Sequence, residues 1–171
     1  MKMYFAADHA GFELKNQLLA YVRDELHHDV EDCGAFRNDP ADDYPEYIAA
    51  AARKLSADVA AGVESCAIVI GASGQGEAMT ANRFTGVRAA LYYGPAGRDQ
   101  TDMSGNQLDM LASTRAHNHA NCLSLGARFM TPDEAKNAVR SWLAVPFSGE
   151  ERHARRVRKI DEVAVQPLST E

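Results

Sequence analysis

The sequence predicts an α/β protein: a three-layer α/β/α, Rossmann-like fold with a five-stranded parallel sheet. Two observations predict this fold. Short apolar runs alternate along the chain with longer segments whose apolar residues recur at helical spacing. The clearest apolar run, Cys66–Ile70, leads directly into a glycine-rich loop and then a helical pattern, as parallel α/β sheets require. At 171 residues the chain has the usual size of one domain, so we expect residues 1–171 to form a single domain.

The individual elements follow from the same patterns. Strands are expected at Met3–Ala7, Val30–Cys33, Cys66–Ile70, Val87–Tyr92 and Cys122–Leu125. Helices are expected at Gly11–His27, Tyr44–Ala61, Glu77–Phe84, Pro132–Leu143 and Glu150–Val163. Asp42 or Asp43 would cap the second helix, and Thr131 the fourth. The last helix, at about 150–163, carries a dense basic run.

The polar segment Gly94–Ser113 yields no prediction of secondary structure. It is rich in Gly, Asp, Asn and Gln and is long for a connection in a compact domain. Such extended loops are often functional lids or partner contacts.

Composition and charge exclude several classes of protein. The net charge of -6 argues against a general nucleic-acid binder, while the basic run Arg152–Lys159 suggests a small anionic ligand. No apolar stretch approaches a signal peptide or a membrane span. The three cysteines are odd in number and show no metal-ligand spacing, so reduced core thiols in the cytosol are expected. We therefore expect a cytoplasmic protein without nucleic-acid or membrane partners.

The glycine-rich loop Gly71–Glu77 is the strongest candidate site. Glycines at 71, 74 and 76 allow tight turns and bring backbone amides close to a ligand. The loop lacks the third glycine of a dinucleotide fingerprint and the Lys-Ser or Lys-Thr pair of a Walker A loop. Glu77, in the first turn of the following helix, is either an acidic residue favoured by the helix dipole or a general base beside amide donors.

Three further pairs of polar residues are candidates. Asp8-His9 follows the first strand, where Asp8 either caps the next helix or contributes to a site. His117-Asn118 is a weak signal by itself, and Arg152 and Arg156 share a helix face that is either a solvated surface or an anion site. All these motifs, except the C-terminal helix, are expected at the carboxyl ends of strands, where such folds bind ligands.

Taken in order, the motifs resemble a known family. They are Asp8-His9-Ala10-Gly11, Asp43-Tyr44-Pro45, Gly74-Gln75-Gly76-Glu77, His117-Asn118, Gly126-Ala127-Arg128 and Arg152-His153 with Arg156. This series resembles the type B ribose-5-phosphate isomerases and the galactose-6-phosphate isomerase subunits, from the first strand to about Ile160.

The resemblance implies a metal-free and cofactor-free aldose-ketose isomerase that acts on a sugar phosphate, most directly ribose 5-phosphate, through an enediolate. Glu77 would be the base, and His117 the acid that opens the sugar ring. The catalytic residues would then be Glu77, His117, Ser73 and Asp8. The substrate-binding residues would be Asp8, His9, Ala72, Ser73, Gly74, Gln75, Gly76 and Asn118, and the phosphate-binding residues Arg128, Arg152 and Arg156. The family also implies a homodimer, with tetramers as a further option, whose site lies at the dimer interface.

Two departures from the family pattern leave alternatives open. One branch of the family has a cysteine base at the start of the glycine loop, where this chain has Gly71, so the resemblance is to the branch with a glutamate base. The segment 94–113 is longer than the family pattern, so the sugar could instead be a tetrose 4-phosphate, allose 6-phosphate or galactose 6-phosphate. A non-catalytic phosphosugar-binding protein would not need Glu77, His117 and Ser73, and is therefore less favoured.

Overall fold

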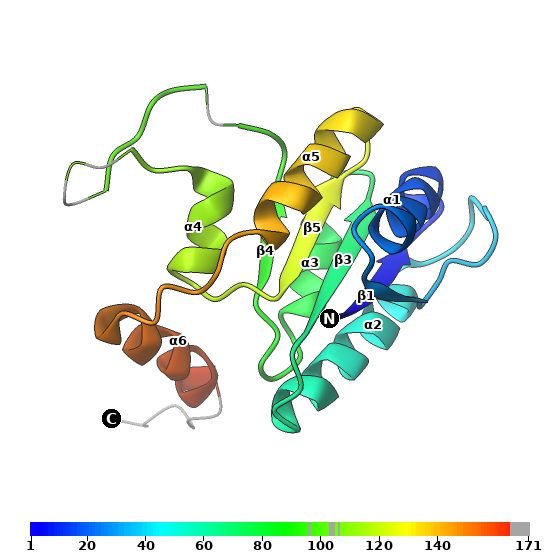
Figure 1. Ribbon diagram of the computed structural model, residues 1–171. Helices are drawn as coiled ribbons and strands as arrows, with labels where there is room; N and C mark the ends of the chain where they lie inside the picture. The colour runs from blue at the N-terminus through cyan, green and yellow to red at the C-terminus, as the bar shows by residue number, and fades with distance from the viewer. Residues whose placement is uncertain (96, 103–104, 106, 165–171) are drawn as a thin grey trace, which may run out of the picture.

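The structure, a computed structural model, describes residues 1–95, 97–102, 105 and 107–164. Its centre is a five-stranded parallel sheet with the strand order β2-β1-β3-β5-β4 (Figure 1). The strands are β1 (Lys2–Ala7), β2 (Asp29–Asp32), β3 (Ser65–Gly71), β4 (Ala89–Tyr92) and β5 (Cys122–Gly126). The fold class and the number and direction of the strands are thus as predicted.

The central strands are buried on both faces, as in other parallel sheets. All seven residues of β3 are buried, and the side chains of β1 alternate between the two faces of the sheet. On one face, Met3 and Phe5 pack against α1 (Phe12–Asp24) and α5 (Pro132–Leu143). On the other face, Tyr4 and Ala6 pack against α2 (Tyr44–Ala60). The result is three layers, visible in Figure 1.

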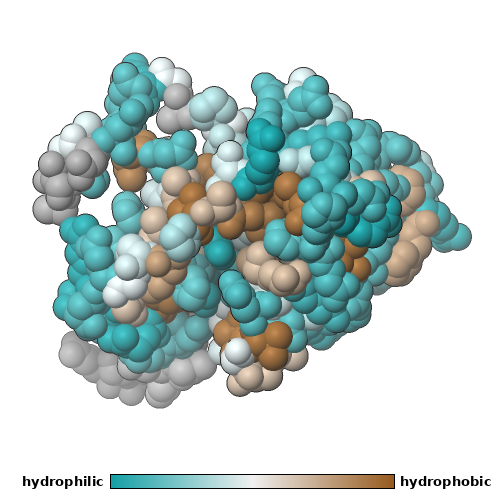
Figure 2. All heavy atoms as spheres, viewed as in Figure 1, coloured by the Kyte–Doolittle hydropathy of each residue, from teal (hydrophilic) through white to brown (hydrophobic). Residues whose placement is uncertain are grey.

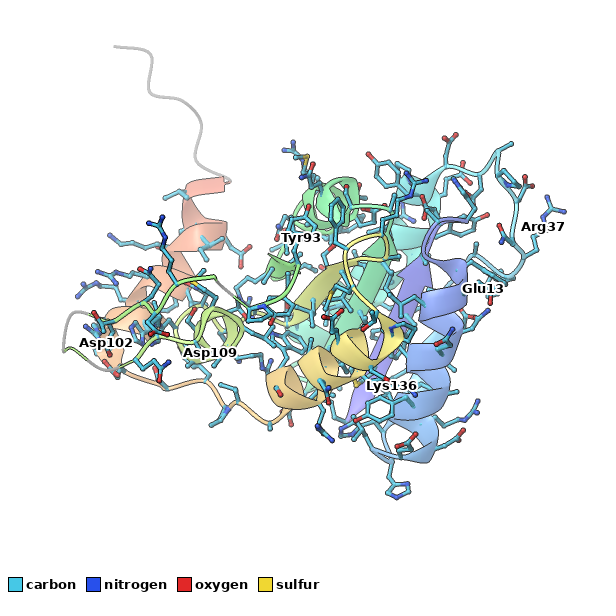
Figure 3. All side chains as sticks on the ribbon, turned by 90° about the horizontal axis from the view of Figure 1, so that it is seen from above. Glu13, Arg37, Tyr93, Asp102, Asp109 and Lys136 are labelled. Carbon is cyan, nitrogen blue, oxygen red and sulfur yellow. The ribbon has the colours of Figure 1, made fainter. Side chains whose placement is uncertain are left out.

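Three other helices complete the described fold. The short α3 (Gln75–Ala81) follows β3 and lies on the α2 face. α4 (Met110–Ala116) is part of the connection from β4 to β5, and α6 (Glu151–Ala164) follows α5. Figure 1 shows α4 and α6 beyond β4, on the side of the sheet away from α1. Seen from above in Figure 3, Asp102 and Asp109 lie on this same side, opposite Glu13 of α1.

Several boundaries differ from the sequence-based prediction. α1 ends at Asp24 instead of His27, which has a positive φ of 56° that a helix cannot continue. α3 begins at Gln75 and ends at Ala81, and β4 begins at Ala89 because a turn through Gly86, at φ 76°, precedes it. The helix α4 was not predicted, since it lies in the polar segment that gave no pattern. Thr131 does cap α5, through a capping box with Glu134.

The strand order fixes where a ligand-binding crevice opens. From β1 the chain passes to β2 on one side of it and then returns to β3 on the other. The connections that leave the carboxyl ends of β1 and β3 therefore diverge to opposite faces, which opens a crevice between those two ends. This is the place where Asp8 and the glycine-rich loop emerge.

Candidate active site

Asp8 is the first residue after β1 and its side chain is held by the backbone that follows. Asp8 Oδ1 accepts hydrogen bonds from the amides of Ala10 and Gly11, at 3.0 and 3.1 Å. Gly11 lies so close to β3 that a Cβ there would be 2.5 Å from the Ile70 carbonyl oxygen. Asp8 therefore does support the start of α1, but the same bonds fix its carboxylate at the mouth of the crevice.

The glycine-rich loop is tied to the end of β5. The carbonyl oxygens of Gly71 and Ala72 accept hydrogen bonds from the amides of Ala127 and Arg128, at 2.8 and 3.2 Å. The carbonyl oxygen of Gly74, a residue with φ of 72°, accepts from Ser124 Oγ at 2.6 Å. These bonds anchor the carbonyl groups of the loop to β5 and to the residues that follow it. The loop leads into the amino end of α3, where the first amides of a helix have no intrahelical partner.

Glu77 is buried at this point, with only 4% of its surface exposed. Its carboxylate lies against Gly71: a Cβ on residue 71 would overlap the carboxylate atoms. Burial raises the pKa of Glu77, and the charge of nearby Asp8 adds to this, while the residue's own backbone amide opposes it. A carboxylate with a raised pKa in a crevice is a candidate general base.

Ser73 and Tyr44 complete this half of the site. Ser73 Oγ accepts a weak hydrogen bond from the amide of Gln75 at 3.3 Å. The ring of Tyr44, at the start of α2, packs against Gly76 so closely that a Cβ there would be 2.6 Å from the phenol oxygen. The tyrosine of the Asp43-Tyr44-Pro45 motif thus covers the loop, which explains why the two motifs occur together.

His9 is linked to a residue that sequence analysis considered only as a helix cap. Asp42 Oδ1 accepts hydrogen bonds from His9 Nδ1 at 2.7 Å and from the His9 amide at 3.2 Å. This hydrogen bond raises the pKa of His9, and the charge of Asp8 adds to the effect, while partial burial of the ring and the charge of Arg128 oppose it. No sequence pattern distinguishes Asp42 from the adjacent Asp43, which occupies the N-cap position of α2 without a side-chain bond.

Four other predicted residues, His117, Asn118, Arg152 and Arg156, form a second group toward the amino ends of the strands. His117 ends α4, and Asn118 lies four residues before β5 begins, so both precede the strand instead of following it. β5 has five residues, and the four steps between them, at about 3.3 Å each, separate the amino and carboxyl ends of the strand by about 13 Å. The expectation that His117 and Asn118 lie at a carboxyl end is therefore wrong, because α4 runs back toward the amino edge before β5 starts.

The second group brings α4 and α6 together. The rings of His117 and His153 lie 4.5 Å apart, and His153 Nδ1 is 2.8 Å from Ser148 Oγ. Burial lowers the pKa of His153, as does the neighbouring His117. Arg152 and Arg156 are exposed on α6, whose visible surface is largely hydrophilic (Figure 2). Arg152 Nε donates to Glu150 at 2.9 Å. Within one chain, Arg152 and Arg156 thus belong to the group around His117 and His153, whereas Arg128 lies near His9.

One set of side chains in the described part of the chain has the composition of a metal site. Ligand atoms of Asp8, His9 and Asp42 lie within 4.8 Å of one another. Asp8 Oδ1 is already engaged by two amides and Asp42 Oδ1 by His9. Within this cluster the Oδ1 atoms of both carboxylates are therefore hydrogen-bonded, whereas Asp42 Oδ2 has no partner among the described residues. The metal-free reaction remains a prediction. The described helices include none that is both long and apolar enough to cross a membrane.

Comparison with known proteins identifies the family. Residues 3–160 match the model of the Ribose/Galactose Isomerase family. The chain belongs to this family. It is 37% identical to ribose-5-phosphate isomerase B of Mycolicibacterium paratuberculosis over 92% of this chain and 87% of that protein. The Mycobacterium tuberculosis protein of the same name is 36% identical over 92% of this chain and 86% of its own length.

Solved structures agree with this assignment. Ribose-5-phosphate isomerase B from Mycoplasma genitalium, with bound ribulose-5-phosphate, matches with a TM-score of 0.81 and 30% identity, covering 97% of each chain. The Thermotoga maritima enzyme matches with a TM-score of 0.76 and 35% identity, over 94% of this chain and 97% of that one. The family resemblance inferred from the ordered motifs is confirmed.

Proposed function

We propose that this protein interconverts ribose 5-phosphate and ribulose 5-phosphate, with Glu77 as the base. The observation that carries this proposal is the position of Glu77: buried, with a raised pKa, against Gly71 and at the carboxyl edge beside Asp8. A non-catalytic binding protein has no need of a buried carboxylate there, since burying a charge destabilises the fold. The names of the relatives and the bound ribulose-5-phosphate in one of them support the choice of sugar.

The proposed chemistry moves two protons, one between neighbouring carbons and one between their oxygens. Glu77 removes the proton from the carbon beside the carbonyl, which gives an enediolate, and returns it to the neighbouring carbon. Ser73 and the amides of Gly74–Glu77 stabilise the developing oxyanion, where each such donor is worth about 3 kcal/mol. Asp8 relays a proton between the two oxygens, and His9 holds the substrate beside it. No metal or other cofactor takes part in this scheme.

The other half of the site comes from a second copy of the chain. In this proposal His117 opens the sugar ring and Asn118 binds a hydroxyl, while Arg152 and Arg156 join Arg128 on the phosphate. Within one chain, however, His117 and Glu77 lie at opposite ends of the strands of the sheet. Large apolar side chains near the glycine loop and the β5 end are exposed, including Met79 at 67% and Phe129 at 61%. A homodimer would cover this surface and bring the two halves together. Further pairing to a tetramer is compatible with this arrangement.

The reaction is tested with a coupled isomerase assay. Wild type is compared with Glu77→Gln on ribose 5-phosphate, allose 6-phosphate, galactose 6-phosphate and erythrose 4-phosphate. We expect ribose 5-phosphate to be the best substrate and Glu77→Gln to lose about three orders of magnitude in kcat, the contribution of a general base. Preference for another sugar would implicate the segment 94–113, whose length departs from the family pattern. Turnover of none of the four would contradict the proposal.

The shared site is tested by mixing two inactive variants. In a heterodimer of Glu77→Gln with His117→Ala, one site carries both substitutions and the other carries none. If each site takes Glu77 from one subunit and His117 from its partner, random mixing restores about a quarter of the wild-type activity. A site built within one chain would stay inactive after mixing. The cytoplasmic location belongs to the same proposal, since it is where free sugar phosphates are metabolised.

A further inference from the structure

The pair formed by His9 and Asp42 has a feature that the proposed chemistry does not require. The Asp42 side chain is only 5% exposed, and its Oδ2 atom is buried without any hydrogen-bond partner among the described residues. Its other oxygen, Oδ1, accepts only from the amide and Nδ1 of His9. A buried carboxylate with one unpaired oxygen is costly unless a cation neutralises it.

Among the described residues, His9 is the only ionisable partner placed to supply that cation. The cationic side chain nearest to Asp42 in sequence, Arg37, donates to Asp39 at 3.0 Å. No salt bridge to Asp42 other than that of His9 is present in the described part of the chain. Removing the proton from His9 would leave the Asp42 charge buried and unpaired. The arrangement therefore favours the imidazolium form of His9.

The other groups facing His9 define its electrostatic surroundings. Asp8, at the end of β1, has its Oδ2 atom 4.0 Å from His9 Nδ1. Asp42 lies in the segment before α2, and Arg128 lies in the segment after β5. Two carboxylates thus oppose one guanidinium. The other ring nitrogen of His9, Nε2, has no hydrogen-bond partner among the described residues. It is therefore available to substrate. About a third of the His9 side chain is exposed, at 33%.

We propose that Asp42 is a positioning residue that holds His9 as an imidazolium, with Nε2–H presented to the substrate phosphate beside Arg128. Asp42 itself, with its side chain buried, touches no substrate. The effect of Asp42 is to add one positive charge and one oriented donor to the phosphate clamp at pH values where a free histidine is neutral. The assignment of the phosphate as the partner of His9 rests on the proposed function. The charge on His9 is independent of the proposed function.

The charge state is measured directly by NMR titration of the histidine ring signals in the full chain. His9 is one of six histidines and is assigned by comparison with His9→Gln. We expect His9 to titrate above the ordinary histidine range in wild type and to fall back to that range in Asp42→Asn. Asp39→Asn, a change in the same segment at a carboxylate that contacts Arg37 and not His9, is the control and should not alter the titration. An ordinary or lowered His9 titration in wild type would overturn the proposal.

The consequence for substrate is measured by KM and kcat as functions of pH. In Asp42→Asn we expect KM for ribose 5-phosphate to rise about tenfold near pH 8, the effect of losing one charged hydrogen bond, while kcat changes much less. Near pH 5.5, where His9 is protonated in both proteins, the two KM values should converge. Asp42→Glu keeps the carboxylate and should recover part of the effect. A purely structural role would lower kcat and raise KM at every pH, and that outcome would also overturn the proposal.

The two measurements separate this inference from the proposed function. If the protein is not an isomerase of ribose 5-phosphate, the kinetic arm fails for wild type as well, while the NMR titration still reports on His9. Inorganic phosphate added to the NMR sample then serves as the probe. We expect it to shift the His9 signals at lower concentration in wild type than in Asp42→Asn at pH 8. Equal phosphate affinity in the two proteins would overturn the assignment of the clamp.

Discussion

The carboxylate of Glu77 occupies the space into which a side chain on Gly71 would project. If, as the resemblance in sequence implies, one branch of the family has a cysteine base at this position, the two kinds of base would reach the same point from different ends of one loop. The contact also explains why residue 71 is a glycine here. Any side chain at 71 would force Glu77 out of its buried position.

Substitution of Gly71 by alanine should therefore remove most of the activity while leaving the fold in place. The added methyl group displaces the Glu77 carboxylate, and a misplacement of about 1 Å can cost a hundredfold in rate. Steady-state kinetics measure the loss, and circular dichroism checks the fold. The control is Gly97→Ala, where an added Cβ meets no atom within 4 Å. Wild-type kcat in Gly71→Ala would contradict the role given to Glu77.

Glu77→Gln should be more stable than wild type above neutral pH. Because the folded-state pKa of Glu77 is raised, the folded protein binds more protons than the unfolded chain as pH rises from the ordinary glutamate value toward the folded value. Stability is therefore lost over that window, and above it the buried charge is a net cost. Glutamine carries no charge and escapes this cost.

Urea unfolding of wild type and Glu77→Gln at several pH values measures this difference. We expect the variant to have the higher midpoint at pH 8 and the two midpoints to converge toward pH 4.5, where Glu77 is protonated. Glu162→Gln, on the exposed surface of α6, should behave like wild type throughout. A variant less stable than wild type at pH 8 would show that the Glu77 charge is stabilised by the fold.

Lys15 should be important for stability, although it plays no part in the chemistry. It is fully buried, and its ammonium group donates to both oxygens of Asp32 at 2.6 and 2.7 Å and to the carbonyl oxygen of Ala35 at 2.7 Å. Lys15→Met removes one partner of this pair and should cost about 3 kcal/mol in the free energy of unfolding. Lys54→Met, which breaks an exposed pair with Glu31, should cost less than about 1 kcal/mol. Equal losses in urea unfolding would refute the distinction.

Chelation should leave activity unchanged. The proposed proton transfer uses only Glu77 and the loop donors, and the possible ligand cluster of Asp8, His9 and Asp42 is engaged in hydrogen bonds. Wild type is assayed before and after dialysis against EDTA. A loss of activity that added divalent metal restores would contradict the metal-free reaction.

The features predicted best from the sequence depend on local interactions. The apolar run of β3, the glycine loop and Glu77 are adjacent in the chain, and the capping box of α5 spans the four residues from Thr131 to Glu134. Their patterns are therefore complete within a short window. α4 was missed because only seven residues form it, and its cap, a bond from the Ala112 amide to Asp109, lies within a polar segment that resembles a loop.

The sequence by itself determined the fold class, the order of the motifs and the family, because strand and helix periodicity and motif spacing are properties of the chain. Only the tertiary structure decided which motifs meet. His9 and Asp42 are 33 residues apart and are joined because the segments that follow β1 and precede α2 meet at one edge of the sheet. His117 and Glu77 are separated because α4 carries the chain back to the amino edge before β5 begins. The glycine loop and Glu77 were visible in the sequence, but the position of the carboxylate against Gly71 follows from the packing of β3 and α3.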